Sequence, residues 1–315
     1  MVQTGRITVY HYDAFSNQPG KGNPAGVVID GEGLSAGQMK VIAGEVGFSE
    51  TSFVMKSDCA DLRIRYFKPG HEMELCGHGT IGTLYCLKIR GLLKQMGIER
   101  EQITIETKAG ILPIGFSDVN GEWYIRMKQV SPQFLPFRGS VDQLADALQI
   151  QADEIDQTLP IVYGSTGTWT LFVPIKRLET FAYMRPENRL FPKILTELPD
   201  ASVHPFCLET YAAHRDMHSR HFCAPHSGTI EDAITGTASG VMGAYYGTYI
   251  DQGDSNLKLI MEQGQELGRD GEVAVFIDRN RESGTGKSEM CIAISGTAVF
   301  VIECLVVYEI KECEV

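Results

Sequence analysis

The chain has 315 residues, of which 43% are hydrophobic and 22% are charged, a composition typical of globular proteins. Its formal net charge of -12 argues against a nucleic-acid partner, which would need clustered lysine and arginine. The same charge is compatible with a small anionic ligand held by a few fixed donors in a cleft. This length is too great for one small core and favours two domains or one large one.

The N-terminal residues contain no apolar segment of the kind that directs secretion. The longest apolar stretch, Ala298 to Val307, is broken by Glu303 and predicts a buried strand, not a membrane span. Eight cysteines are scattered without a CxxC pair, so we expect reduced thiols. These features predict a cytoplasmic protein that does not associate with membranes.

In the first half of the chain, β-branched and aromatic residues alternate over several short runs that predict strands. Residues 35–46 have helical spacing and a capping residue in Ser35, and residues 77–93 form a second helix that opens on glycine. A Gly/Pro-rich loop separates the first two strands. The predicted strands are 7–15, 27–29, 49–55, 62–67, 103–116 (interrupted by KAG) and 123–130.

The second half repeats this arrangement of strands and a glycine-opened helix. After a predicted crossover at 132–136 and a helix at 141–150, strands precede a second glycine-opened helix at 234–250. Further strands close the chain. The predicted strands of this half are 159–165, 170–175, 204–213, 257–264, 273–278, 290–296 and 298–310.

Two similar turns open the central helices, CGHGTIGT in the first half and ITGTASG in the second. Gly77 and Gly236 are 236 - 77 = 159 residues apart, about half the chain. This repeat predicts two similar domains that aim helix N-termini at a shared cleft, where free N–H groups would hold a carboxylate. The alternative is that both helices are only the cores of their sheets.

Two acidic residues are candidates for acid/base chemistry. Glu50, in GFSETSFV, has small and apolar neighbours, and partial desolvation would raise its pKa toward general-base values. The alternative is a surface or capping carboxylate beside Ser49. Asp232, in EDAITGTASG, is a second candidate acid/base or an orienting group, and the alternative for it is a helix N-cap.

His78 and Cys76 lie at the mouth of the first helix, in ELCGHGT. A histidine held there can donate to a substrate or relay a proton, and a cysteine there would have its thiolate stabilised by the helix terminus. Simple packing of a buried thiol is the alternative for Cys76.

Three other patterns do not support a cofactor. SGTGKS at 283–288 lacks the first glycine of a phosphate-binding loop, because Arg281 occupies that position. The run 214–226 has four histidines and Cys223, but its spacing does not suit zinc. HEMELCGH offers His71, Cys76 and His78, but its glycines suit backbone contacts better than a metal. No dinucleotide fingerprint follows a strand, and we expect neither a metal nor a cofactor.

The chain resembles the phenazine-biosynthesis isomerase family, which has the diaminopimelate-epimerase fold. The matching motifs occur in order along nearly the whole chain: NPAGVV (23–28), SETSFV (49–54), FKPGHEMELCGHGTIGT (67–83), EDAITGTASG (231–240) and QGQELGRDG (263–271). The resemblance implies an α/β (α+β) protein with two similar domains, each a mostly antiparallel sheet wrapped around a central helix. We expect these domains to be 1–130, completed by the strand 298–315, and 131–297.

The resemblance also implies roles for particular residues. Glu50, His78 and Asp232 match the catalytic positions, and Ser49, Gly77, Gly236 and Thr237 match substrate-binding positions. Epimerase relatives use a cysteine at each helix start, but here only Cys76 is present. Ala233 replaces a proline of the family motif, and Cys76 and Gly79 differ from the phenazine enzyme, so phenazine-pathway activity is not favoured.

The function implied is that of a cofactor-independent isomerase that moves a proton between carbons of a small carboxylate, and the resemblance suggests a homodimer. The alternatives are a thiol-dependent amino-acid racemase or epimerase, and a non-catalytic small-molecule binding protein on the same fold. The sequence leaves the substrate open. We expect Cys76 to be a bystander and Glu50 to be the working base.

Overall fold

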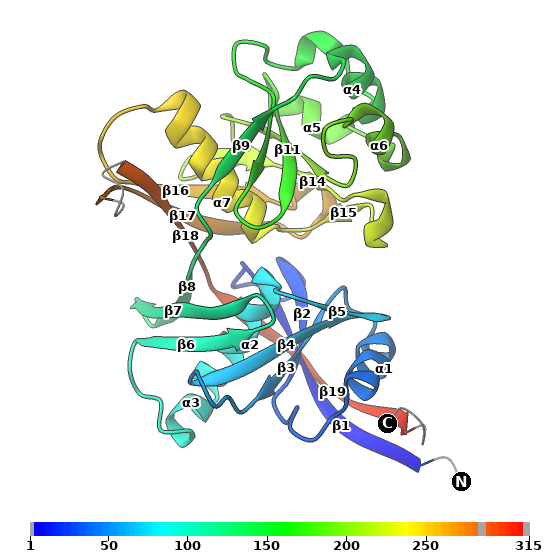
Figure 1. Cartoon of the computed structure of the whole chain (residues 1–315), viewed down its shortest axis with the longest axis vertical. Coiled ribbons are helices and arrows are strands. Elements are labelled where there is room, and N and C mark those ends of the chain that lie inside the picture. The colour runs from blue at the N-terminus through cyan, green and yellow to red at the C-terminus, as the bar shows by residue number, and fades with distance from the viewer. Residues whose placement is uncertain (1–2, 283–287, 311–315) are drawn as a thin grey trace. The chain divides into compact units, whose positions relative to one another are not determined.

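A computed structural model of the chain describes residues 3–282 and 288–310 (Figure 1). Contacts divide the chain into two compact units. The first runs to Met127 and is completed by the segment that begins at Gly296, and the second is Lys128–Ser295. Most of the segment that resembles a phosphate-binding loop, 283–287, lies outside the described residues.

The first unit contains one mostly antiparallel sheet in which neighbouring strands follow the order β19, β1, β2, β3, β4, β6, β7, β8. Only β2–β3 and β4–β6 pair in parallel, and β5 pairs with the other half of β4. The strands are β1 (Gln3–Ala14), β2 (Asn23–Val28), β3 (Thr51–Met55), β4 (Leu62–Lys68), β5 (His71–Met73), β6 (Gln102–Thr107), β7 (Gly110–Val119), β8 (Glu122–Lys128) and β19 (Ala298–Ile310).

Two helices cover opposite faces of this sheet. Phe53 and Phe67 pack in the cluster that α1 (Ala36–Val46) closes, while their chain neighbours Ser52 and Tyr66 point to α2 (Gly77–Ile89). This alternation is the period of two that a strand imposes. The helix α2 is buried on most sides, as a central helix must be, and a short helix α3 (Leu92–Gln95) follows it.

The end of α1 positions the chain for the functional site. Ser35 caps the helix in a capping box with Gln38, which confirms the predicted start. Gly47 ends the helix with φ 74°, a left-handed conformation that favours glycine. The chain therefore turns abruptly and enters β3 through Ser49 and Glu50.

The second unit has a sheet of the same kind, in the order β9, β10, β11, β12, β13, β16, β17, β18, with β14 beside β12 and β15 beside β14. Its strands are β9 (Gln133–Pro136), β10 (Val162–Ser165), β11 (Trp169–Pro174), β12 (Ser202–Cys207), β13 (Met217–Ser219), β14 (His221–Phe222), β15 (Glu231–Asp232), β16 (Leu257–Gln263), β17 (Gly271–Glu282) and β18 (Ser288–Gly296). Its helices are α4 (Val141–Leu148), α5 (Glu179–Tyr183), α6 (Phe191–Ile194) and α7 (Gly236–Tyr245), with short helical turns η1 (Ala152–Glu154), η2 (Asn188–Leu190), η3 (Pro225–Ser227), η4 (Tyr246–Ile250, a π-helix) and η5 (Gln265–Leu267).

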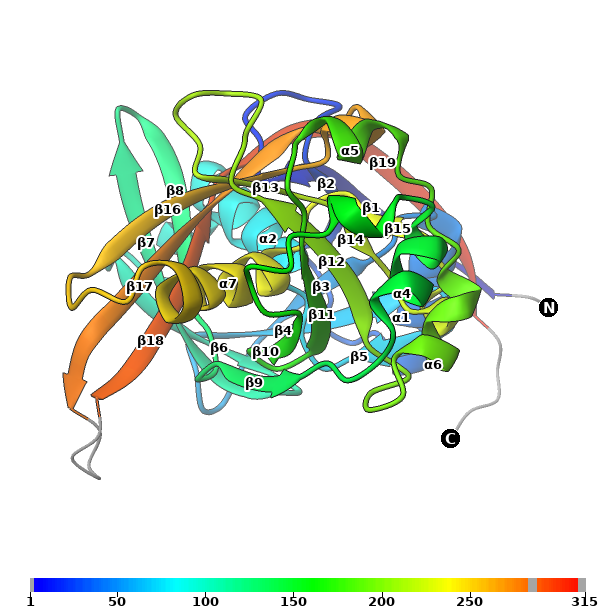
Figure 2. The same ribbon diagram turned by 90° about the horizontal axis from the view of Figure 1, so that it is seen from above.

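The two units share one topology. In the second, β11–β12 and β13–β16 are the parallel pairs, as β2–β3 and β4–β6 are in the first. The central helix, α2 or α7, belongs to the crossover of the second parallel pair in each unit. Against α7 the sheet comes so close that a Cβ on Gly243 would lie 2.5 Å from Val275 Cγ1. Each unit therefore has one central helix that opens on glycine, α2 and α7, both of which are labelled in Figure 2.

Two local predictions are wrong. Residues 133–136 form the strand β9, paired with β10, where we expected a plain crossover. The stretch Ala298–Val307 is a strand, as predicted, but it is not buried, since Leu305 is 64% exposed and Val307 is 53% exposed. The reason is that β1 and β19 extend as a two-stranded ribbon beyond the part of the sheet that α2 covers (Figure 1). No helix in the described part of the chain is long and apolar enough to cross a membrane.

Candidate active site

The N-terminus of α2, which we call its mouth, is held in place by its N-cap residue, Cys76. Its backbone is extended, its Sγ accepts a hydrogen bond from the Gly79 amide at 3.3 Å, and its carbonyl accepts from the Thr80 amide and hydroxyl at 2.9 and 2.7 Å. The Thr80 hydroxyl also meets the Tyr66 hydroxyl of β4 at 2.6 Å. The bond to Cys76 Sγ satisfies one of the N–H groups that a helix start leaves over, that of Gly79, and Gly77 and His78 carry two others.

Glu50 stands between this mouth and β4. Its backbone carbonyl accepts from the Gly26 amide at 3.1 Å, which fixes the residue beside β2. Its carboxylate is buried, with Oε1 3.1 Å from Nζ of Lys68 and Oε2 2.9 Å from Nε2 of His78. A buried carboxylate is thus enclosed by two potential cations.

The pKa of Glu50 contradicts the expected direction. Burial does raise it, and this is the largest single effect, but the nearby charge and hydrogen bond of His78, the charge of Lys68 and a hydrogen bond from Ser49 together outweigh burial. The pKa of Glu50 is lowered to about 2. The prediction of a raised pKa was therefore wrong, because the local sequence does not reveal which cations the fold brings to the carboxylate.

His78 is buried among polar partners. Besides Glu50, its ring lies 3.3 Å from the Asn23 amide nitrogen and 3.6 Å from Cys76 Sγ. Burial opposes the charged imidazole, but Cys76 and Glu50 raise the pKa of His78 well above its usual value. Glu50 and His78 therefore form a carboxylate–imidazolium pair, with Lys68 as a second cation.

The second unit carries a related but different mouth. Thr235 is the N-cap of α7, so Asp232 is not the helix cap. The carboxylate of Asp232 instead accepts a hydrogen bond from the Thr235 hydroxyl at 2.5 Å, and Gln263 links the backbones of both residues. His221, on β14, is the neighbour of Asp232 on β15. Burial lowers the pKa of His221 to about 4, although the charge of Asp232 acts to raise it, so His221 is neutral at pH 7.

The two mouths correspond residue by residue. Thr235 occupies the place of Cys76, 235 - 76 = 159 residues later, the same interval that separates Gly77 and Gly236. The Thr235 carbonyl accepts from both the amide and the hydroxyl of Ser239, as the Cys76 carbonyl does from Thr80. The second mouth therefore offers a hydroxyl where the first offers a thiol.

The predicted site residues fall into two groups. The structure brings Glu50, His78, Cys76 and Ser49 together around Gly77 in the first unit, while Asp232 precedes Gly236 and Thr237 at the start of α7 in the second. Sequence reasoning missed Lys68 and Asn23 as members of the first group. Both lie in motifs that carry the family resemblance, FKPGHEMELC and NPAGVV, and this was the available signal.

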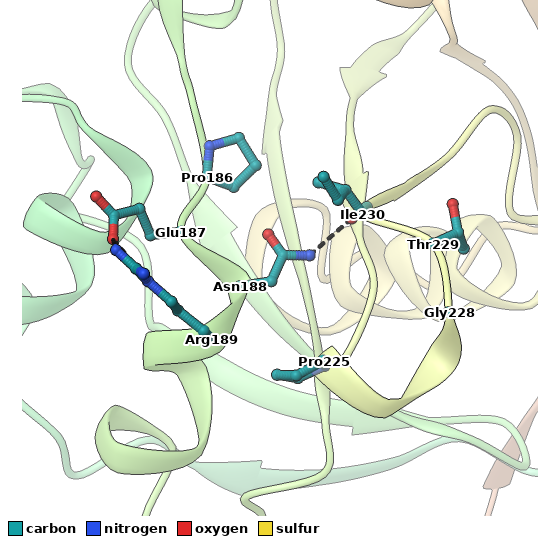
Figure 3. A pocket seen from close by; sticks show the side chains of 8 residues that line it. All are labelled: Pro186, Glu187, Asn188, Arg189, Pro225, Gly228, Thr229 and Ile230. Atoms are coloured by element: carbon teal, nitrogen blue, oxygen red, sulfur yellow. Dashed lines mark hydrogen bonds and ion pairs between the residues drawn. The ribbon is translucent and has the colours of Figure 1, made fainter.

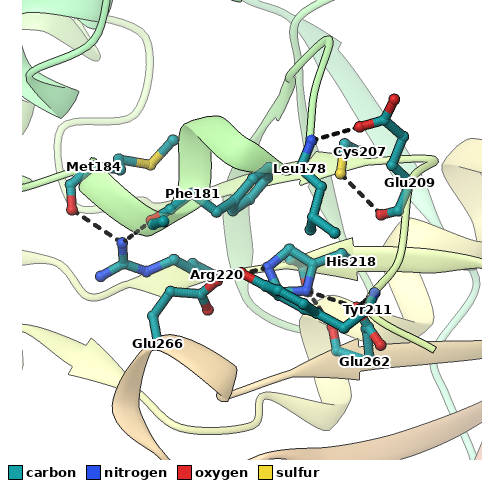
Figure 4. A network of polar contacts seen from close by, with 12 residues as sticks. Leu178, Phe181, Met184, Cys207, Glu209, Tyr211, His218, Arg220, Glu262 and Glu266 are labelled. Atoms are coloured by element: carbon teal, nitrogen blue, oxygen red, sulfur yellow. Dashed lines mark hydrogen bonds and ion pairs between the residues drawn. The ribbon is translucent and has the colours of Figure 1, made fainter.

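The histidine-rich run does not form one site. His214 pairs with Glu272, and His226 with Asp200. His218 lies buried between Glu262 and Glu266, in a network that also includes Tyr211 and Arg220 (Figure 4). Within residues 3–282 and 288–310, the group of three metal-binding side chains that do come together is Glu50, Cys76 and His78, whose ligand atoms all lie within 4.8 Å of one another.

A separate pocket of about 500 Å³ lies in the second unit (Figure 3). Asn188, at its centre, donates hydrogen bonds to the carbonyls of Cys223 and Ile230, both at 2.7 Å. None of the predicted site residues lines this pocket.

Comparison with known proteins defines the class. Residues 12–304 match the family described as phenazine biosynthesis-like protein. The chain is 50% identical over 292 residues to an uncharacterized isomerase, YfhB, of Bacillus subtilis, a match that covers 93% of this chain and 96% of the relative. It is 31% identical over 267 residues to a trans-2,3-dihydro-3-hydroxyanthranilate isomerase of Pseudomonas chlororaphis, covering 83% and 88% of the two chains.

A crystal structure of a phenazine biosynthesis protein of the PhzF family from Bacillus anthracis is 53% identical and superposes with a TM-score of 0.91, covering 96% of this chain and 99% of the other. The fold is therefore of the diaminopimelate-epimerase type, as predicted. The chain belongs to the phenazine biosynthesis-like family. The prediction that the protein is an enzyme of the isomerase class is confirmed.

Proposed function

We propose that the protein is a cofactor-independent isomerase that moves a proton between two carbons of a small carboxylate, with Glu50 as the group that takes up and returns the proton. The observation that carries this proposal is the buried Glu50 carboxylate held between His78 and Lys68 at the mouth of α2. A structural carboxylate has no need of this position. A proton-transfer group does, because it must be ionised, oriented and close to free N–H groups.

The low pKa of Glu50 reflects its pairing with His78 and Lys68, which outweighs burial. A base with a pKa of about 2 takes a proton from carbon poorly. An anionic substrate changes this balance, because its carboxylate competes with Glu50 for the charge of Lys68 and for the N–H groups of the helix mouth. The pKa of Glu50 therefore rises when the substrate binds, and Glu50 becomes a stronger base at the step in which it must remove a proton.

The reaction then proceeds with its protons balanced. Glu50 takes the proton from an acidic carbon, and the electron pair of that C–H bond delocalises toward the substrate carboxylate. The α2 amides and Lys68 stabilise the charge that builds up there. Glu50 returns the proton to a second carbon, or to the other face of the first. His78 holds the Glu50 carboxylate in place throughout. Asp232, from the second unit, orients the substrate or relays the proton.

Solvent exchange tests this function. Small carboxylates, among them the dihydro-hydroxyanthranilate named for the Pseudomonas chlororaphis relative, are incubated with the protein in heavy water, and NMR follows the loss of C–H signals. The proposal expects exchange or isomerisation of at least one carboxylate without added metal. Binding of a carboxylate with neither exchange nor isomerisation would support a non-catalytic binding protein instead.

A thiol-dependent racemase is the second candidate, favoured by one observation. Cys76 Sγ lies 3.6 Å from the His78 ring and accepts from the Gly79 amide at the start of α2, the place where epimerase relatives carry a cysteine. Against it, Thr235 stands at the matching position of the second mouth, where a two-thiol mechanism needs a cysteine. We therefore favour Glu50 as the base.

We propose that the protein acts as a homodimer in the cytoplasm. The seven described cysteines form no disulfide with one another, which suits a reducing compartment. The dimer surface we propose is the uncovered face of the β1–β19 ribbon, where Leu305 and Val307 are exposed. The Arg6–Val307 pair lies at one end of this surface and the Tyr10–Glu303 pair lies at the other. Soluble proteins seldom leave such an apolar strip to water.

The ribbon face is complementary to itself. Cross-strand pairs follow one another as Arg6–Val307, Thr8–Leu305 and Tyr10–Glu303. A two-fold axis through the middle pair sets Arg6 of one copy against Glu303 of the partner subunit, twice. Sedimentation should give a dimer for the parent and a monomer for Leu305→Glu. A Leu305→Glu variant that stays dimeric would rule out this face.

A further inference from the structure

We infer that Glu50, Cys76 and His78 form a preformed binding site for Zn²⁺, and that zinc bound there blocks the protein reversibly. The three side chains come from two segments, the approach to β3 and the start of α2, which the hydrogen bonds of Gly26 and Thr80 fix in place. The site is therefore built by the backbone and does not depend on flexible side chains alone.

The distances fit a tetrahedral ion. With metal–ligand bonds of about 2.0 Å to nitrogen and oxygen and about 2.3 Å to sulfur, the edges of a tetrahedron are about 3.3–3.5 Å. The His78 Nε2 atom lies 3.6 Å from Cys76 Sγ and 2.9 Å from Glu50 Oε2. All three ligand atoms lie within 4.8 Å of one another, so the side chains would have to close in to reach one zinc ion, and the fourth position is left for water or an anion.

Each ligand has a partner that would hold it toward a metal. Glu50 would bind through Oε2 while Oε1 keeps its contact with Lys68 at 3.1 Å. Cys76 Sγ already accepts a hydrogen bond from the Gly79 amide, which holds the sulfur at the start of α2. The other ring nitrogen of His78 faces the Asn23 amide at 3.3 Å, whose oxygen can accept the imidazole N–H after a flip of the amide. Such partners orient metal ligands and strengthen them.

Charge and donor type favour zinc in particular. A carboxylate and a thiolate would together balance the charge of a bound Zn²⁺. The sulfur, nitrogen and oxygen set suits zinc and not magnesium or calcium, which prefer oxygen alone. The three residues are only 5–7% exposed, so an ion bound there would be largely shielded from solvent.

Zinc would block proton transfer because it occupies the Glu50 oxygen that meets His78 and removes the imidazolium proton. Inhibition rests on the proposed function, but binding does not. The two are therefore measured separately, so that failure of either claim is recognised on its own.

The test titrates the EDTA-treated, full-length protein with Co²⁺, a spectroscopic substitute for zinc, and then displaces it with Zn²⁺. We expect one equivalent of Co²⁺, a thiolate-to-cobalt charge-transfer absorption, proton release into a weak buffer, and quenching of the absorption by zinc. In Cys76→Ser the charge-transfer absorption should vanish, and zinc affinity should fall by ~100-fold or more.

Two variants keep the result interpretable. His214→Gln removes an exposed member of the histidine-rich run and should leave binding unchanged. Glu50→Gln should weaken zinc binding by ~10-fold or more while circular dichroism confirms the fold. Binding that survives in Cys76→Ser and Glu50→Gln but disappears in His214→Gln would overturn the inference, as would the absence of any thiolate–cobalt absorption in the parent. Zinc binding without loss of proton exchange would contradict only the inhibition.

Discussion

The imidazole of His78 and the carboxylate of Glu50 meet with 2.9 Å between Nε2 and Oε2, and both side chains are buried. Burial penalises each charge, yet the pair is ionised because each group supplies the charge that the other lacks. Their coupling, with Lys68 as a third member, has consequences for stability and rate that can be measured.

The ionised pair makes stability depend on pH in a defined direction. The pKa of Glu50 is 4.5 when unperturbed and about 2 in the folded protein, so its stabilising contribution is present above pH 4.5 and is lost as pH falls toward 2. Urea unfolding should show Glu50→Gln less stable than the parent by ~3 kcal/mol at pH 6, because the variant removes the carboxylate that faces the buried His78 imidazolium and Lys68.

This difference in the free energy of unfolding should shrink steadily below pH 4.5. Glu45→Gln, the same change at an exposed residue of α1, serves as the control and should stay near the parent at every pH. A difference between Glu50→Gln and the parent that stays constant from pH 6 to pH 3 would mean that Glu50 is not held in its ionised form by His78.

Lys68→Met should change both binding and basicity. Removing the charge 3.1 Å from Oε1 takes away one of the causes that lower the pKa of Glu50, so the pKa rises and the acid limb of the pH–rate profile moves to higher pH. The KM for an anionic substrate should rise by ~10-fold or more. Lys40→Met, at an exposed position of α1, should do neither. An unchanged acid limb would remove Lys68 from the account.

Cys76→Ala separates the acid/base isomerase from the thiol racemase. If Cys76 only caps α2 and packs, activity should stay within ~10-fold of the parent. Cys86→Ala, a buried thiol on the same helix, measures the cost of packing alone. A loss of ~1000-fold in Cys76→Ala with the fold intact would show that the thiol is the working base.

Asp232→Asn tests the contribution of the second unit. We expect turnover to fall by ~10-fold or more while the melting temperature changes little, because Asp232 is only half-buried and is not the cap of α7. Asp200→Asn, at an exposed carboxylate, is the matched control. Full activity in Asp232→Asn would confine the chemistry to the first mouth.

Local sequence predicted those parts of the fold that local chemistry decides. The capping box of Ser35, the strand period of ITVYHYDAF and the glycine-opened starts of α2 and α7 are all present. What depends on distant partners was less accessible. The exposure of Leu305 follows from where α2 ends, and the pairing of β9 follows from β10, neither of which a pattern within the segment can reveal.

The candidate site shows the same limit. Its composition from Glu50, His78 and Cys76 came from motifs, but the sign of the pKa shift at Glu50 depends on Lys68, eighteen residues further along the chain and brought close by the β3–β4 hairpin. Asn23 reaches His78 only because β2 lies beside α2. Long-range contacts, and not residue types, decide the electrostatics of this site.

The central claim, that Glu50 carries the proton, is tested most directly by measuring deuterium uptake from heavy water into a turned-over carboxylate, with parent and Glu50→Gln compared in the presence of EDTA. The account predicts uptake by the parent, a loss of about a hundredfold or more in Glu50→Gln, and substrate binding that changes little. Equal uptake by the parent and Glu50→Gln would contradict it.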